Sequence, residues 1–160
     1  MPDLWVVNAS PLIVLAKIGR EGWLLELPDA AVVPEPVARE VLNGPEDDPA
    51  RRCIASGHFP VAPDRPIPAS LAAWDLDAGE TAVLAVALAD RAYTAVVDDA
   101  AARRCARALG VPVRGTLGVA LEAKKRGLVP RLGPVLDQLR DAGLHVGDNV
   151  VREVLARVGE

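Results

Sequence analysis

The sequence predicts an α/β protein with a mostly parallel sheet of four or five strands and helices on both faces. Short, β-branched runs alternate with longer helical segments along the whole chain. Such alternation requires crossover connections, which make the strands parallel and cover both faces of the sheet. At 160 residues, 51% of them hydrophobic, the chain has the length of a single domain, so we expect one three-layer α/β/α domain over residues 1–160.

The strands are predicted from short apolar runs bounded by turn residues. We expect four of them and a further short edge strand, the last in this list: Leu4–Val7, Ala31–Val33, Tyr93–Val97, Val111–Val113 and His58–Val61. Acidic or proline-rich segments over Gly44–Pro49 and Pro60–Pro68 indicate surface loops.

The helices are predicted from capping residues at their starts and glycine or proline at their ends. We expect a helix opened by Asn8 to Pro11 that ends at Gly19, then Trp23–Leu27, Pro36–Leu42, Asp77–Ala89, Ala100–Leu109 and Thr116–Arg126. Two more helices, broken at Gly143–Gly147, form a C-terminal extension over about 130–160.

Composition excludes several classes of protein. The net charge of −4 argues against nucleic-acid binding by bulk electrostatics, although local basic clusters occur. The longest apolar stretches, such as Thr81–Ala89, are too short to span a membrane, and no leader segment is visible, so a soluble, cytoplasmic protein is expected. Cys53 and Cys105 lack metal or redox spacing and are interpreted as reduced thiols.

Polar side chains follow two of the predicted strands. Asn8 and Ser10 come after the first strand, and Asp98 and Asp99 come after the strand that ends at Val97. In an open parallel sheet, the binding crevice lies beyond the carboxyl ends of the strands. Adjacent carboxylates repel each other unless a cation neutralises them, and Mg²⁺ or Mn²⁺ takes oxygen ligands. The pattern therefore predicts a magnesium or manganese site.

Each acidic residue also has a structural interpretation. Either Asp98 or Asp99 could serve only as the N-cap of the helix that follows. Asp77 and Glu80 have the spacing of a reciprocal helix cap, and Glu40 could be an ordinary exposed helix residue.

The nearby cations and histidines are less informative. Arg103 and Arg107 lie four and eight residues after Asp99, so they could form surface ion pairs or bind phosphate beside a metal. His58 and His145 have no partner at ligand or catalytic spacing and are assigned no role.

Five motifs follow one another along nearly the whole chain. They are Val6-Val7-Asn8-Ala9-Ser10-Pro11-Leu12-Ile13, Pro34-Glu35-x-Val37-x-x-Glu40-Val41, Asp77-x-Gly79-Glu80, Val96-Val97-Asp98-Asp99-x-x-x-Arg103 and Gly115-Thr116-Leu117-Gly118. No single motif is specific, but their order and spacing together resemble the PIN-domain superfamily, in the uncharacterised branch related to toxin ribonucleases of the VapC type.

The resemblance implies that acids from distant segments converge on one or two Mg²⁺ or Mn²⁺ ions, which activate water against an RNA phosphodiester. It implies catalytic roles for Glu40, Glu80, Asp98 and Asp99, and metal binding by these four and by Asn8. Asn8 stands where such nucleases usually have an aspartate, so the site has one negative charge fewer and a second metal is doubtful.

Two hypotheses follow from these observations. The first is a metal-dependent endoribonuclease, the toxin of a type II toxin–antitoxin pair, which is homodimeric and held inactive by a small antitoxin encoded nearby. Its RNA substrate would be contacted by Ser10, Arg103 and Arg107. The alternative is a non-catalytic PIN-like module that binds RNA or protein, which Asn8 favours. A phosphoacceptor receiver domain fits less well, because its paired aspartates would end the first strand.

Overall fold

The sheet has five parallel strands in the order β3-β2-β1-β4-β5. The computed structural model describes residues 1–160. The strands are β1 (Leu4–Val7), β2 (Ala30–Pro34), β3 (Val61–Ala62), β4 (Tyr93–Val96) and β5 (Val113–Arg114). All four pairs are parallel, which confirms the predicted α/β class.

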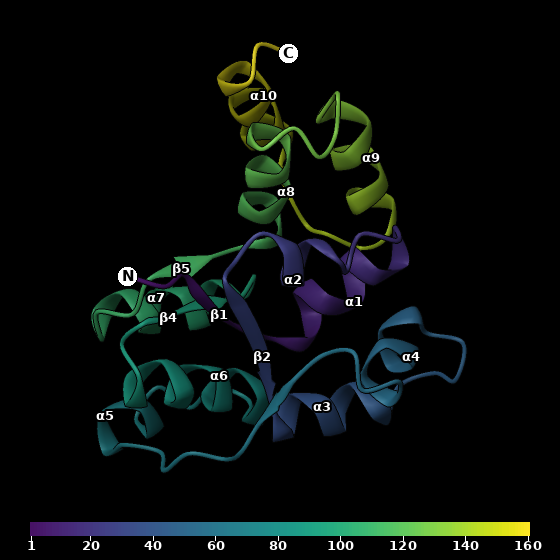
Figure 1. Cartoon of the computed structure of the whole chain (residues 1–160). Coiled ribbons are helices and arrows are strands. Elements are labelled where there is room, and N and C mark those ends of the chain that lie inside the picture. The colour runs from purple at the N-terminus through teal and green to yellow at the C-terminus, as the bar shows by residue number, and fades with distance from the viewer.

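Ten helices connect and extend the strands (Figure 1). They are α1 (Ala9–Lys17), α2 (Trp23–Glu26), α3 (Glu35–Leu42), α4 (Pro49–Ala55), α5 (Ala69–Ala72), α6 (Ala78–Ala89), α7 (Ala100–Ala108), α8 (Thr116–Lys125), α9 (Gly133–Asp141) and α10 (Asp148–Arg157). Helices α1, α2 and α8 lie on one side of the strands and α3, α5 and α6 on the other, so both faces are covered as predicted.

The centre of the sheet is buried on both faces. Trp5, Val6 and Val7 of β1 are fully inaccessible to solvent, as are Ala95 and Val96 of β4. Near-continuous apolar strands of this kind are typical of parallel sheets covered by helices on both sides. A core of 41 buried apolar residues continues into the helices, so the central strands hold the residues that follow them in fixed positions.

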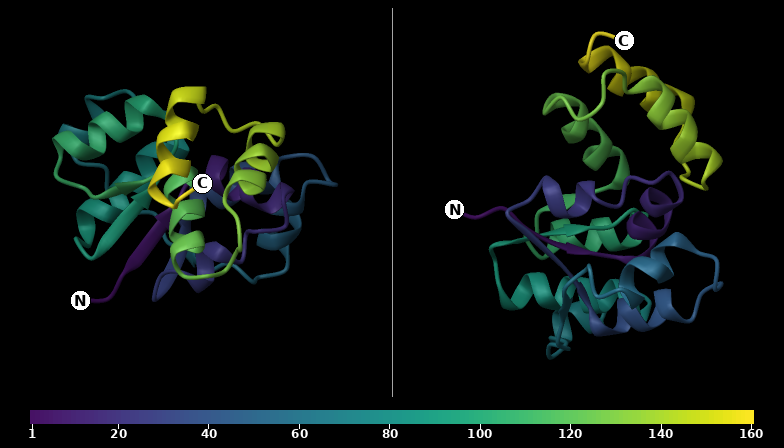
Figure 2. Two further views of the ribbon diagram at one scale, coloured as in Figure 1. Left: turned by 90° about the horizontal axis from the view of Figure 1, so that it is seen from above. Right: turned by 45° about the vertical axis from the view of Figure 1, so that its right-hand side comes forward.

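The C-terminal helices stand apart from the sheet. Helix α8 packs against α1, α2 and α9, and the right-hand view of Figure 2 shows α9 and α10 at the end of the molecule beyond α8. The Glu160 side chain accepts hydrogen bonds from the Leu132 and Gly133 backbone N–H groups, at 2.7 and 3.0 Å. The chain end is thereby tied to the start of α9.

The last strand begins two residues later than predicted and ends one residue later, at Arg114. The N–H of Val111 donates to the Ala106 carbonyl at 2.8 Å and closes the end of α7, where Gly110 has a φ of 74°. Pro112 has no N–H to donate. The pairing with β4 therefore begins only at Val113.

The segment before α6 also differs from the prediction. The edge strand was expected over His58–Val61, but β3 is Val61–Ala62, because Pro60 cannot donate to the ladder and only its carbonyl pairs, with the Val33 N–H at 2.9 Å. Helices α4 and α5 were not predicted. The start of α4 was readable, since Asp48 caps it by accepting from the Ala50 N–H at 2.9 Å.

Two further expectations can be compared with the structure. No helix has both the length and the apolar composition needed to cross a membrane. Neither cysteine forms a disulfide, and Cys105 is buried while Cys53 is partly buried.

Candidate metal-binding site

The site lies where the strand order reverses, between the adjacent strands β1 and β4. Val7 pairs with Val96, and the Asn8 N–H continues the ladder by donating to the Val96 carbonyl at 3.0 Å. Asn8 and the Asp98–Asp99 pair therefore leave the sheet side by side. The sequence predicted this meeting, because the carboxyl ends of parallel strands lie on one edge of the sheet.

A pocket of about 290 Å³ occupies this edge. We call it the acidic pocket. Its lining residues come from three strand ends or helix starts and from the loop between α9 and α10: Asn8, Ser10, Glu80, Asp98, Asp99, Gly143, Leu144 and His145. Three carboxylates and one amide thus face a common space.

Asn8 is buried, with 7% of its surface exposed, yet its side chain does not cap α1. A Cβ built on Gly79 would lie 3.3 Å from Asn8 Oδ1, so glycine at position 79 leaves room for this amide. The amide makes no side-chain hydrogen bond to the helix it precedes, and its polar atoms are not shut away from the pocket. The Asn8 amide lines the acidic pocket and is available to a ligand.

Glu80 lies in the first turn of α6 and has the most perturbed carboxyl of the pocket. Burial, and after it repulsion from Asp77, Asp99 and Glu40, raises the pKa of Glu80 from 4.5 to about 7. A backbone hydrogen bond at Asp77 lowers the pKa by a smaller amount. Asp77 caps the helix by accepting from the Glu80 N–H at 2.8 Å. The predicted cap therefore exists, but only Asp77 serves it, and the Glu80 side chain lines the pocket.

Glu40 approaches the same region from α3, which packs against α6. A Cβ built on Gly79 would lie 3.5 Å from Glu40 Oε2 and 3.6 Å from Asp77 Oδ1. Partial burial and the charge of Asp77 raise the Glu40 pKa. Glu40 does not line the acidic pocket itself, so it belongs to the surrounding charge cluster.

Asp98 and Asp99 divide their roles. Asp98 accepts two hydrogen bonds from Thr116, at 2.7 Å from the backbone N–H and at 2.6 Å from the hydroxyl. Asp99 caps α7 by accepting from the Ala102 N–H at 2.9 Å. One member of the pair is therefore a helix cap, as the alternative interpretation allowed, while both still line the acidic pocket.

Thr116 is a site residue to which the sequence analysis assigned no role. It is fully buried at the start of α8, and its two bonds to Asp98 connect the end of β4 to that helix. Its place in the Gly115-Thr116-Leu117-Gly118 motif was the available signal, but only the packing of α8 shows that Asp98 is its partner.

The predicted substrate contacts are only partly brought together. Ser10 lines the acidic pocket. Arg103 donates to the Val97 carbonyl at 3.3 Å, beside Asp98. Arg107 lines neither this pocket nor the larger groove between β5, α8 and α10 that adjoins it. His145, which was assigned no role, lies on the rim with Asp98.

The residues present fit a hard divalent cation by donor type and charge. They offer oxygen ligands, which Mg²⁺ and Mn²⁺ prefer. The raised pKa of Glu80 reflects first its burial and then the negative charges of its neighbours. No group of three Asp, Glu, His or Cys side chains lies close enough together to hold a metal ion in this structure. An ion held here would therefore take water ligands beside the one or two carboxylates that reach it, as Mg²⁺ commonly does.

A comparison with known families agrees with this arrangement. The model of the DUF3368 family, described as a PIN domain, matches residues 4–160. The chain belongs to this PIN domain family. PIN domains are typically nucleases that bind divalent metals, and the five-stranded parallel sheet flanked by helices is PIN-like. No curated protein matches the chain.

Proposed function

We propose that this PIN domain is a metal-dependent endoribonuclease. The observation that carries the proposal is the crowding of Glu80, Asp98, Asp99 and the Asn8 amide around one pocket at the switch point of the sheet. Perturbed carboxyl groups in a cleft are typical of catalytic sites. The pKa of Glu80 is raised to about 7 because burial and the neighbouring carboxylates disfavour its ionised form, and a bound cation would offset that cost.

Asn8, Glu80, Asp98 and Asp99 would hold Mg²⁺ or Mn²⁺, with Glu40 adding negative charge from α3. The chemistry that a bound ion supplies is activation of water and stabilisation of charge on the leaving oxygen. The hydrogen bonds from Thr116 keep the Asp98 carboxylate oriented toward the pocket. Glu80 can hold or release a proton near neutral pH.

The test is cleavage of a structured RNA pool with Mn²⁺, using the wild type, Glu80→Gln and Asp98→Asn. Both variants should lose on the order of 100-fold or more in rate, as expected when a catalytic carboxylate is removed. Asp137→Asn, at an exposed position of α9, is the matched control and should cleave like the wild type. Equal cleavage by all four proteins would trace the activity to a contaminant.

We further propose that the protein acts as the toxin of a type II toxin–antitoxin pair and forms a homodimer in the cytoplasm. The support is the resemblance of its motifs to VapC-type toxins. A short open reading frame beside this gene should encode a protein that co-purifies with the chain and suppresses its cleavage of RNA. Light scattering on the purified chain measures whether it dimerises.

A second candidate function is a PIN-like module that binds RNA or protein without cleaving it. Asn8 favours this candidate, because replacing a carboxylate by an amide weakens metal binding. The outcome that would support it is RNA or protein binding without cleavage at any Mg²⁺ or Mn²⁺ concentration.

A further inference from the structure

A second, larger groove of about 520 Å³ adjoins the acidic pocket. It lies between β5, the outer side of α8, and α10, and we call it the basic groove. Asp98, Leu144 and His145 line both spaces. The two are therefore contiguous, and a molecule seated in one can extend into the other.

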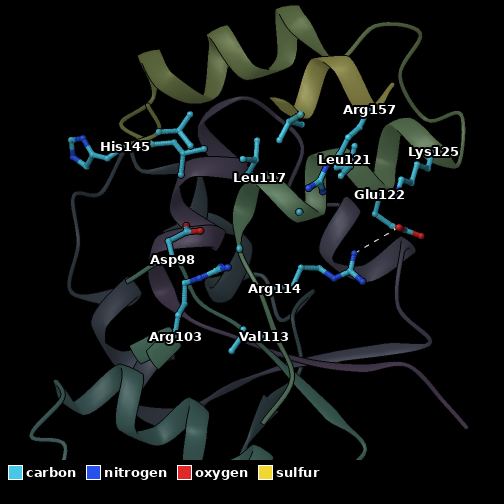
Figure 3. Close-up of a pocket in the computed structure, with 15 residues that line it drawn as sticks. Asp98, Arg103, Val113, Arg114, Leu117, Leu121, Glu122, Lys125, His145 and Arg157 are labelled. Carbon is cyan, nitrogen blue, oxygen red and sulfur yellow. Dashed lines mark ion pairs between the residues drawn. The ribbon is translucent and has the colours of Figure 1, made fainter. Parts of the chain in front are cut away.

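Four cationic side chains from four different elements line the basic groove. They are Arg103 of α7, Arg114 of β5, Lys125 of α8 and Arg157 of α10. In the view of Figure 3, Asp98 and Arg103 lie at one end of the groove, with Lys125 and Arg157 toward the other. In a chain with a net charge of −4, this concentration of positive charge stands out.

Carboxylates neutralise these cations only in part. Of the residues that line the groove, only Asp98 and Glu122 are acidic, and Glu122 is shared between Arg114 at 3.8 Å and Arg126 at 3.0 Å. Glu153, outside the lining, pairs with Arg157 at 3.1 Å, while Lys125 has no carboxylate within ion-pair distance. The four cations therefore still outnumber the carboxylates beside them, next to the acidic pocket.

The groove is elongated along α8. Leu117, Leu121 and Lys125 follow one another at intervals of four residues and all line it, so they form one face of the helix. At 1.5 Å per residue, this face is about 12 Å long. A stacked nucleic-acid strand advances about 3.4 Å per nucleotide, so the face has room for about three nucleotides.

The surface between the cations is aliphatic. Besides the two leucines of α8, it consists of Val113, Leu144, Val146 and Val154, and no Phe, Tyr or Trp lines the groove. Stacking platforms for bases are aromatic. A strand in this groove would therefore be held by its phosphates, without selection for particular bases.

We propose that the basic groove binds the backbone phosphates of single-stranded RNA on one side of the phosphodiester in the acidic pocket. The proposal rests on the proposed function for the identity of the polymer. In this proposal, the C-terminal helix α10 has a role, because its Val154 and Arg157 form one side of the groove. The contact between RNA phosphates and the groove does not require a bound metal.

The test measures the binding of a fluorescein-labelled oligouridylate of about 12 nucleotides by fluorescence anisotropy in EDTA. The double variant Lys125→Gln/Arg157→Gln removes two exposed cations of the groove. We expect its affinity to fall on the order of tenfold or more. The slope of log K against log salt should also become shallower by about 1.4, since each phosphate contact of a single strand contributes about 0.7.

The control is Lys17→Gln/Arg104→Gln, which makes the same change in net charge at exposed positions outside both spaces. It should bind like the wild type. Equal binding by both double variants, or no RNA binding by the wild type, overturns the proposal. Because the binding assay contains no metal, its result does not depend on catalysis. If RNA binding depends on the groove but the protein does not cleave RNA in Mn²⁺, the proposed nuclease activity is wrong and the proposed RNA-binding groove still holds.

Discussion

At the scale of single residues, the acidic pocket combines a neutral amide with crowded carboxyl groups. Asn8 is nearly buried and has no protein partner for its amide, while Glu80 has its pKa raised to about 7 by burial and by neighbouring carboxylates. One additional negative charge at position 8 would worsen the repulsion without a cation and improve the binding of one. A carboxylate at position 8 would therefore lower the stability of the metal-free protein and raise its affinity for a cation.

Asn8→Asp should tighten Mn²⁺ binding by about tenfold, equivalent to about 1.4 kcal/mol, because a carboxylate replaces an amide at the ion. Without metal, the same variant should be less stable than the wild type. Calorimetric titration with Mn²⁺ and thermal melts in EDTA measure the two effects. Asn149→Asp, on the exposed side of α10, is the control, and an equal gain in affinity from both variants would contradict a site at Asn8.

Glu80 also predicts a pH dependence of the metal-free protein. Its pKa is about 7 in the fold against an ordinary value of 4.5, so its contribution favours the fold fully below pH 4.5 and is lost as the pH rises through about 7. The raised pKa of Glu40 acts in the same direction. Stability in EDTA should therefore fall over this range.

Glu80→Gln should remove most of that pH dependence. At pH 8, the variant should be more stable than the wild type by about 1 kcal/mol, a value reduced for solvent screening of a partly exposed group. Urea denaturation at several pH values measures it. A variant as sensitive to pH as the wild type would mean that the protonation responsible lies elsewhere.

At the scale of elements, the site depends on the junction between β4 and α8. Asp98 lies two residues after β4 and accepts hydrogen bonds from both the backbone N–H and the hydroxyl of Thr116, at 2.7 and 2.6 Å. Gly115 permits the close approach, since a Cβ there would lie 3.1 Å from Asp98 Oδ1 and 2.6 Å from Arg103 Nη1. The orientation of Asp98 is thus decided by a helix that follows it 18 residues later in the chain.

Thr116→Val should destabilise the protein by about 1.5–3 kcal/mol, because it removes a buried hydroxyl donor to a charged acceptor and retains the shape. RNA cleavage should fall as well, since Asp98 is then less well oriented. Thr116→Ser keeps the hydroxyl and is the matched control. Chemical denaturation and the cleavage assay, run on both variants, distinguish loss of the hydrogen bond from loss of packing.

At the scale of the whole molecule, the core does not depend on a metal. The 41 buried apolar residues form one cluster through the sheet and the surrounding helices, and the acidic pocket lies at the edge of that cluster. A metal at the pocket would therefore add stability to a protein that is already folded.

EDTA should leave the far-ultraviolet circular dichroism unchanged. Mn²⁺ at about 100 times its dissociation constant should stabilise the fold by about 2.7 kcal/mol, and Glu80→Gln should abolish most of that gain. Thermal melts with and without Mn²⁺ measure both. Unfolding in EDTA alone would show instead that the metal is part of the core.

Much of the fold could be predicted because its signals are local. Apolar runs and capping residues indicate where an element begins and ends, and alternation of strands with helices requires parallel pairing. The same reasoning correctly placed Asn8 beside Asp98 and Asp99, since they follow strands of one sheet. It missed α4, although Asp48 and Pro49 marked its start, and it placed β5 too early because the N–H of Val111 completes a helix end.

Only the tertiary structure decided how the remaining groups meet. Packing of α3 against α6 brings Glu40 toward Glu80, packing of α8 gives Asp98 its Thr116 partner, and α10 adds Arg157 to the basic groove. These contacts join segments far apart in the chain, and their geometry depends on strand order and helix packing, which no local pattern encodes. The sequence by itself determined an α/β sheet with acids at its edge, and the packing of helices around that edge determined which of them share a pocket.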